Sequence, residues 1–212
     1  MKKYMIIFLL CVVSFCSFPI NYSFAAEALD ENVFQWVQST PRANYFFNKQ
    51  AMTYEIGADG FANTNILIVP TVRTFDNMQI QDVITKRQWR NQSTYRFNEL
   101  SGVAEYLRIN LQTKTVEYTD CVYLDQGYNS LNETYTRSTQ NMQTMSKKDV
   151  DYAFYQAIID YEATHRKELL SKIKDQVRPA DLKAAGIKAD HNAKSDKNVK
   201  NDKKKVKVVK RR

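Results

Sequence analysis

The sequence is poor in the residues on which much enzyme chemistry relies, since its 212 residues include 3 cysteines and 2 histidines. It also lacks the zinc-protease motif HExxH, the serine-hydrolase motif Gly-x-Ser-x-Gly, a phosphate-binding glycine loop and paired Cys-x-x-Cys zinc ligands. His165, late in a predicted helix and next to Arg166, is expected at the boundary between core and solvent rather than as a catalytic base. We therefore expect no enzyme activity, no catalytic residues, no metal site and no cofactor.

No apolar run is long enough for a stable membrane span, which takes about 20 residues. The unbroken apolar run Met5–Val13 follows the positive charges of Lys2 and Lys3. Further on, Ser23-Phe24-Ala25 places small residues at the two positions that a signal peptidase reads. These features predict a secretory signal peptide at residues 1–25 and an exported protein that is secreted, periplasmic or associated with the cell surface.

Two variants of this export signal have different consequences. A lipoprotein needs small residues before its lipidated cysteine, but Cys11 follows Leu10 and Cys16 follows Phe15, so lipidation is disfavoured. Retention of an uncleaved signal would instead give a membrane-tethered form, and this alternative stays open.

Cleavage after Ala25 leaves Cys121 as the only cysteine of the mature chain. A single cysteine cannot form an intramolecular disulfide, so the hydrophobic core must hold the fold. Cys121 lies in a strand-like segment, where we expect it to pack as a small apolar residue. An intermolecular disulfide and a nucleophile are the alternatives, with His165 and His191 as the available histidine partners.

Positive charge is concentrated at the C-terminal end of the chain. Residues 179–212 contain 12 Lys or Arg and 4 Asp, whereas residues 26–178 contain 17 basic and 19 acidic residues. The sequence therefore predicts a nearly neutral domain over 26–178 and a disordered basic tail over 179–212. Such a tail suits anionic surface polymers, and because the chain is exported we expect no nucleic acid partner. Its candidate polyanion-binding residues are Lys203, Lys204, Lys205, Lys207, Lys210, Arg211 and Arg212.

Alternating apolar residues bounded by turn residues predict a series of short strands. The expected strands cover 33–38, 44–56, 65–69 with a continuation over 71–75, 103–111, 115–124 and 131–135. Pro70 cannot donate to a sheet, so we expect an edge or a bulge there. The short turn between 103–111 and 115–124 indicates a hairpin and hence an antiparallel sheet. Within the second strand, plain alternation places Val116, Tyr118 and Asp120 opposite Glu117, Thr119 and Cys121.

Apolar residues at spacings of three and four predict one long helix that follows the strands. Ser146 is its expected N-cap, with Asp149 at the third helical position, and Arg178-Pro179 is its expected end. Residues 76–90 fit either a short amphipathic helix or a loop with a strand. The fold class is therefore α+β: an antiparallel sheet of about five to six strands with a long C-terminal helix packed on one face.

Acidic residues in this sequence have ordinary structural explanations. Asp149 and Asp151 lie two apart on the predicted helix and do not share a face, so we expect a cap and a surface residue. Glu117, Asp120 and Asp125 lie near a turn, but three acidic residues in this pattern do not by themselves indicate a metal site.

Aromatic residues are abundant along the predicted strands, with 13 tyrosines and 11 phenylalanines in the chain. Cross-strand packing is the ordinary explanation. An exposed row of tyrosines is the alternative, because tyrosine suits a recognition surface that is dry at one end and wet at the other. The candidate binding residues are Tyr106, Tyr118, Tyr123 and Tyr128.

Several short motifs over residues 33–136 resemble the bacterial surface-adhesin protein E-like family of small exported domains. The motifs are Trp36-Val37, Asn44-Tyr-Phe-Phe47, the apolar strand Ile66–Val69, Tyr106-Leu-Arg-Ile109, Tyr118-Thr-Asp-Cys-Val-Tyr123 and the turn Asp125-Gln-Gly127. The resemblance implies an antiparallel sheet with a C-terminal helix on one face and a role in surface binding rather than catalysis. The chain departs from a lipid-anchored, disulfide-bearing version of the pattern, because it has no convincing lipidation motif and no second mature cysteine.

Together, these features predict an exported, adhesin-like binding protein of the bacterial envelope or exterior. Its partner would be a surface polyanion or an extracellular protein. A secreted enzyme or enzyme inhibitor with an unrecognised site, and a structural subunit of the envelope, are the alternatives.

Overall fold

Eight strands form one antiparallel sheet in the computed structural model, which describes residues 28–188. The strands are β1 (Phe34–Ser39), β2 (Ala43–Asn48), β3 (Thr53–Ile56), β4 (Ala62–Phe75), β5 (Leu100–Asn110), β6 (Thr115–Asp125), β7 (Ser130–Thr134) and β8 (Gln140–Asn141). Six follow the order β1-β2-β4-β5-β6-β7, while β3 pairs with β4 and β8 pairs with β6. The predicted α+β class and antiparallel sheet are confirmed, and the predicted signal peptide lies outside the described residues.

The expected strand over 44–56 is divided in two by a turn. Asn48 ends β2, and its side-chain oxygen accepts hydrogen bonds from the backbone N–H groups of Gln50 and Ala51 at 3.0 and 2.8 Å. An Asn side chain that binds the backbone two or three residues ahead stabilises a turn. The chain therefore reverses before β3 begins.

Pro70 lies inside the long strand β4 rather than at an edge or a bulge. On one side it is paired with Tyr106 of β5. On the other side, β3 pairs with β4 up to Ile68 and β2 pairs with it from Thr71 onward. The proline thus occupies the gap between two neighbouring strands, where its missing N–H leaves no partner unsatisfied.

A bulge in β6 changes the predicted faces of that strand. Tyr118 pairs with Leu107, but the next pairing joins Asp120 to Tyr106, so Thr119 is the extra residue. One extra residue reverses the direction of every side chain that follows it. Cys121 therefore lies on the same face as Tyr118, not on the opposite face as simple alternation predicted.

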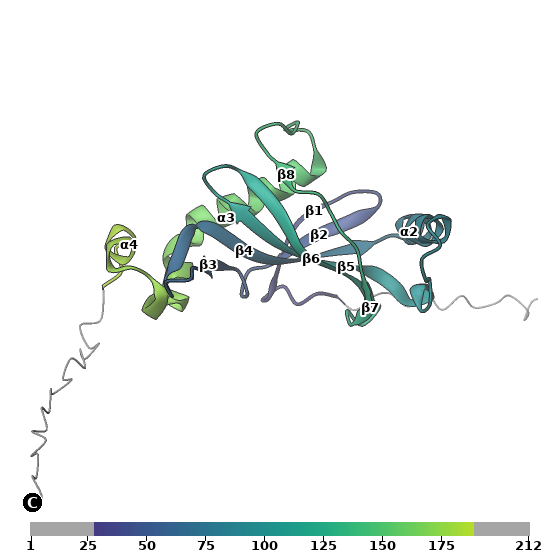
Figure 1. Cartoon of the computed structure of the whole chain (residues 1–212), viewed down its shortest axis with the longest axis horizontal. Helices are drawn as coiled ribbons and strands as arrows, with labels where there is room; N and C mark the ends of the chain where they lie inside the picture. The colour runs from purple at the N-terminus through teal and green to yellow at the C-terminus, as the bar shows by residue number, and fades with distance from the viewer. Residues whose placement is uncertain (1–27, 189–212) are drawn as a thin grey trace, which may run out of the picture.

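One long helix runs along one face of the sheet, and two shorter helices lie at opposite ends of the molecule (Figure 1). They are α2 (Asn77–Trp89), α3 (Val150–Lys172) and α4 (Pro179–Ala184), with short 3₁₀ turns at Phe97–Glu99 and Lys174–Gln176. The larger hydrophobic core joins Leu67, Leu107 and Val116 of the sheet to α3, and the smaller core packs Val103 and Tyr123 of the same face against α2. Residues 76–90, for which the sequence allowed either a short helix or a loop with a strand, therefore form a helix.

The long helix begins later and ends earlier than predicted. Its N-cap is Asp149, whose carboxylate accepts the Asp151 N–H at 2.8 Å, whereas Ser146 lies in the preceding turn. At the other end Ile173 leaves the helical region with a φ of −119°. The chain then turns so that Val177 reaches the core, where it is 3% exposed.

The first part of the expected disordered tail is also structured. Pro179 starts α4 at a position where a missing N–H costs nothing, and Leu182 of this helix is 4% exposed within the larger core. Ile187 packs against the same core. Leu182 and Ile187 thus anchor this segment to the core, while residues 189–212 lie outside the described part of the chain.

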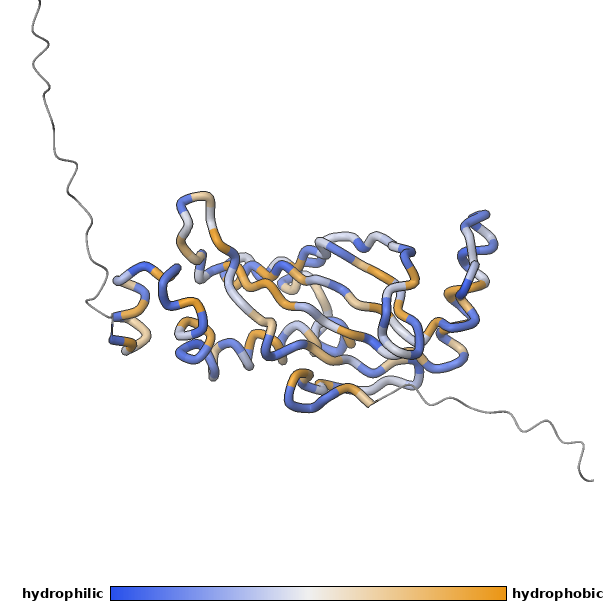
Figure 2. Tube along the Cα trace, turned by 90° about the horizontal axis from the view of Figure 1, so that it is seen from below, coloured by the Kyte–Doolittle hydropathy of each residue, from blue (hydrophilic) through white to orange (hydrophobic). Residues whose placement is uncertain are grey.

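The other face of the sheet carries no helix of the described segment. Trp36, Phe46, Val72, Ala104 and Val122 are Cα partners in a continuous row across five strands of this face. None of these residues belongs to either hydrophobic core. Apolar and polar residues alternate along the central strands (Figure 2), as expected for a sheet whose two faces differ. We call this surface the open face.

Candidate functional site

A groove of about 840 Å³ lies on the open face, at the end of the sheet next to α2. Its aromatic lining comes from Phe34, Trp36, Phe46, Phe75 and Tyr128, and its uncharged polar lining from Gln35, Asn44, Thr74, Asn77, Ser101 and Gln126. Ligand pockets in proteins typically have volumes of about 300–1,000 Å³ and combine apolar walls with a few polar groups. The groove, which we call the open-face groove, has this size and composition.

A chain of hydrogen bonds positions the tryptophan of the groove. The β1–β2 hairpin places Trp36 opposite Phe46. The indole Nε1 donates to Ser39 Oγ at 3.2 Å, and Ser39 Oγ donates to Asn44 Oδ1 at 2.6 Å. Asn44 Nδ2 in turn donates to Thr74 Oγ1 on β4 at 3.0 Å. The indole is thus held by its polar edge while its side chain stays 53% exposed.

The N-terminal lead-in contributes to the groove through Ala28, Leu29 and Glu31. The Asp30 carbonyl accepts the backbone N–H groups of Val33 and Phe34 at 3.0 and 2.8 Å, so the lead-in turns directly into β1. This turn keeps the lead-in beside the open face.

The β6–β7 turn contributes Gln126 and Tyr128. Asp125 shapes it, because one carboxylate oxygen accepts the N–H groups of Gly127 and Asn129 at 2.9 and 2.8 Å. Tyr128 has a φ of 61°, in the left-handed region that non-glycine residues seldom adopt. Residues held in such conformations are over-represented at functional sites.

The groove is electrically neutral. Glu31 and Lys49 are the charged residues in its lining, and they have opposite signs. The remaining polar groups are amides and hydroxyls, which both donate and accept hydrogen bonds. The arrangement therefore suits a neutral ligand that is rich in hydroxyl or amide groups and has apolar faces for the aromatic rings.

Comparison with family models, with curated proteins and with solved structures finds no match to this chain. The resemblance to the surface-adhesin protein E-like family stays a prediction. No helix within residues 28–188 is long and apolar enough to span a bilayer.

The four tyrosines predicted as binding residues do not share a surface. Tyr106 is 44% exposed on the open face, and Tyr128 lines the open-face groove. Tyr118 and Tyr123 lie on the helix-covered face, where Tyr118 bonds to Tyr155 of α3 and Tyr123 packs edge-on against Phe97. Tyr118, which is partly buried, and Tyr123, which is buried, are therefore packing residues, as the ordinary explanation expected, and the four tyrosines do not form the alternative exposed row.

Sequence reasoning missed the amide and hydroxyl partners of Trp36. Asn44 and Thr74 are 30 residues apart, and their contact depends on the pairing of β2 with β4. The aromatic residues Trp36 and Phe46 were the signal that could have pointed to the groove. In the structure each is more exposed than its neighbours along the strand.

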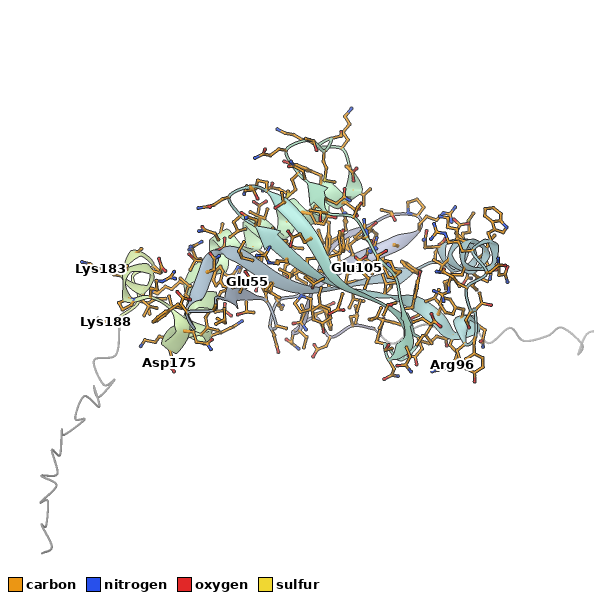
Figure 3. The ribbon with its side chains drawn as sticks, viewed as in Figure 1. Glu55, Arg96, Glu105, Asp175, Lys183 and Lys188 are labelled. Carbon is orange, nitrogen blue, oxygen red and sulfur yellow. The ribbon has the colours of Figure 1, made fainter. Side chains whose placement is uncertain are left out.

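A buried polar cluster lies on the opposite, helix-covered face, centred on Glu105, which Figure 3 shows near the middle of the sheet. Glu105 is 2% exposed and accepts hydrogen bonds from Arg73 at 2.5 Å, Tyr135 at 2.6 Å and Arg137 at 3.2 Å. Arg137 also pairs with Asp151 at 2.6 Å. Asp151 was expected on the surface, but this contact across to α3 makes it part of the cluster.

The cluster alters the acid–base properties of its neighbours. Burial is the largest single influence on the Arg73 guanidinium and would lower its pKa, but the charges of Glu105, Tyr135, Tyr45 and Asp151 together outweigh burial and raise the pKa. Burial, and then the charge of Glu105, raise the pKa of the Tyr135 hydroxyl. These groups therefore stay in their ordinary charge states at neutral pH, as a structural network requires.

Cys121 lies beside this cluster, paired with Glu105 across β5 and β6. The thiol is free and 4% exposed. Burial, and then the nearby charge of Glu105, raise its pKa to about 11. A nucleophilic cysteine needs a lowered pKa, so the packed thiol predicted from sequence is confirmed.

The remaining candidates also have structural roles. His165 stacks on Tyr161 at a centroid distance of 3.9 Å, and it is half-buried, as predicted. Glu117 pairs with Arg108 at 3.0 Å, and Asp125 shapes its turn. Within the part of the chain that the structure describes, no three acidic, histidine or cysteine side chains converge as metal ligands would.

Proposed function

We propose that this chain is an exported, non-catalytic binding protein whose open-face groove holds a saccharide chain. The observation that carries the proposal is the neutral groove of about 840 Å³, in which the exposed Trp36 lies among amide and hydroxyl side chains. Aromatic rings pack against the apolar faces of sugar rings, while amides and hydroxyls pair with sugar hydroxyls. A groove open along a sheet face suits a polymer that continues beyond the site.

The predicted export signal supports this ligand class. A secreted or surface-associated protein meets the polysaccharides of envelopes and of host surfaces, and we infer that the groove is the specific contact. The basic tail, which includes Lys203 and Arg212, would add a non-specific attraction to anionic polymers.

The 2 tryptophans of the chain provide a direct test. Trp36 lines the groove, while Trp89 is 80% exposed at the C-terminal end of α2 and does not line it. In a Trp89→Phe variant, titration with cellohexaose, chitohexaose and maltohexaose should shift or quench Trp36 emission with at least one of these sugars. The matched Trp36→Phe variant should show no change in Trp89 emission.

Affinity measurements complete the test. Trp36→Ala should weaken binding of the responding sugar by about tenfold or more, because a central aromatic residue commonly contributes that much. Trp89→Ala should bind like the unchanged protein. The proposal is overturned if none of the three sugars changes Trp36 emission, or if Trp36→Ala and Trp89→Ala bind equally well.

A further inference from the structure

A second cavity, of about 180 Å³, lies on the helix-covered face under the edge of α2. Its apolar and aromatic walls include Tyr45, Phe75, Val83 and Val103. Two arginines, Arg42 and Arg73, also line it, and no carboxylate does. The cavity therefore combines an apolar body with a positively charged lining.

Arg73 has an unused hydrogen-bond donor. Its guanidinium pairs with Glu105 at 2.5 Å through one terminal nitrogen, but its Nε is buried and has no hydrogen-bond partner. A buried donor that is left unsatisfied costs about 1–3 kcal/mol, so native structures rarely keep one without a reason. The Nε itself is inaccessible, so a ligand in the cavity would meet the part of the Arg73 side chain that is 15% exposed.

Arg42 supplies the second cation from the rim. Among the described residues, Arg42 forms one ion pair, in which its terminal nitrogen lies 3.0 Å from Asp82, and both side chains are about half exposed. Exposed pairs of this kind contribute at most about 1 kcal/mol, so Arg42 can turn towards a bound anion at small cost.

A neighbouring cavity of about 330 Å³ extends the positive region. It shares Val83, Tyr123 and Tyr135 with the first cavity, and its lining adds Lys86 and Arg90, again without a carboxylate. Neither of these two side chains forms an ion pair with any described residue. Both cavities thus favour negative charge.

We propose that the cavity beneath α2 binds a small organic carboxylate with an aromatic or branched apolar body. The carboxylate would pair with the guanidinium groups of Arg42 and Arg73, since the planar fork of a guanidinium matches the geometry of a carboxylate. The apolar body would pack against Phe75, Val83 and Val103. The site shares Phe75 with the open-face groove, but its arginines and its other lining residues are its own, and it does not depend on the proposed saccharide ligand.

Benzoate is the probe, and benzyl alcohol is its neutral counterpart of similar shape. Titration of the ¹⁵N-labelled chain should shift the amide signals of Val83 and Val103 with benzoate, while the signals of Trp36 and Phe46 stay unchanged. Benzoate should bind about tenfold more tightly than benzyl alcohol, since a charge-assisted pair with arginine is the stronger bond. Inorganic phosphate should bind more weakly than benzoate, because it makes no use of the apolar walls.

Three substitutions locate the site. Val83→Trp fills the cavity and should abolish benzoate binding, while Met78→Trp, on an exposed position of the same helix, should not change it. Arg42→Gln, an exposed change that leaves the core intact, should weaken benzoate binding by about threefold to tenfold and leave benzyl alcohol unaffected.

Three outcomes would overturn the assignment: equal affinity for benzoate and benzyl alcohol, equal affinity for phosphate and benzoate, or unchanged benzoate binding in both Val83→Trp and Arg42→Gln. If Val83→Trp fails to fold, the Arg42→Gln comparison alone decides between these outcomes.

Discussion

At the scale of single residues, Glu105 is a charged side chain that is almost completely buried in the described chain. It is nearly inaccessible to water and holds two arginines and a tyrosine on one face of the sheet. A buried carboxylate of this kind is tolerated only while its partners remain in place, because an unpaired buried charge is costly.

Removal of this charge should therefore destabilise the fold. Glu105→Gln leaves Arg73 and Arg137 without their shared partner and should lower the free energy of unfolding by about 3–5 kcal/mol. Glu117→Gln, which loses only a half-exposed pair with Arg108, should cost about 1 kcal/mol or less. Urea unfolding followed by circular dichroism measures both, and equal costs would show that the Glu105 cluster has no special role.

Cys121 should be protected from alkylation while the protein is folded. In a chain that begins at Ala26, iodoacetamide should label Cys121 at neutral pH only after denaturant is added, because the folded thiol is buried. Its pKa is raised from 9.0 to about 11 in the folded state. The corresponding stability is fully present below pH 9.0 and is lost as the pH rises towards about 11. Rapid labelling of the folded protein at pH 7 would contradict this.

At the scale of elements, local sequence patterns predicted single strands and helices well, but they did not predict the contacts between distant segments. The hairpin of β5 and β6 and the body of α3 follow from alternation and helical spacing, which neighbouring residues determine. The bulge at Thr119 and the place of Pro70 depend on which strands pair, which no local pattern states. For the same reason the open-face groove could not be predicted, since its lining comes from the lead-in, β1, β2, β4, α2, β5 and the β6–β7 turn.

The N-cap of α3 can be tested by two nearby substitutions. Asp149→Ala should reduce stability by about 1 kcal/mol, because it removes the acceptor of the Asp151 N–H. Ser146→Ala, three residues earlier in the turn, should cost clearly less. Thermal unfolding of both variants measures the difference, and the reverse order would restore Ser146 as the cap.

The helix α4 should contribute to stability although it follows the main helix. Leu182→Ala removes a side chain that is 4% exposed in the larger core and should cost about 2–3 kcal/mol. Lys183→Ala, on the exposed side of the same helix, should have little effect. Chemical unfolding compares the two, and equal stability would mean that α4 packs too loosely to matter.

At the scale of the whole molecule, we propose different roles for the described domain and for the basic C-terminal part of the chain. The domain carries paired charges such as Arg108 with Glu55, where a hydrogen bond from the guanidinium lowers the pKa of the carboxylate. Its specific contacts would thus depend on shape and hydrogen bonding rather than on net charge. The excess of positive charge lies in the C-terminal part of the sequence, and the proposed attraction of this part to a polyanion would be long-ranged and sensitive to salt.

This division predicts how a truncated chain behaves. Because α4 and Ile187 pack against the core, the cut belongs after Lys188 rather than after Ala180. Removal of residues 189–212 should preserve the unfolding midpoint and sugar binding in the groove, yet abolish most retention on an anionic polymer column at low salt. It should also flatten the dependence of retention on salt, because fewer counterions are released.

A chain in which the basic residues of 203–212 are replaced by Gln is the matched control and should behave like the truncated one. Unchanged retention in both chains would place the attraction on the domain instead, with Lys86 and Arg90 beside α2 as the first residues to replace.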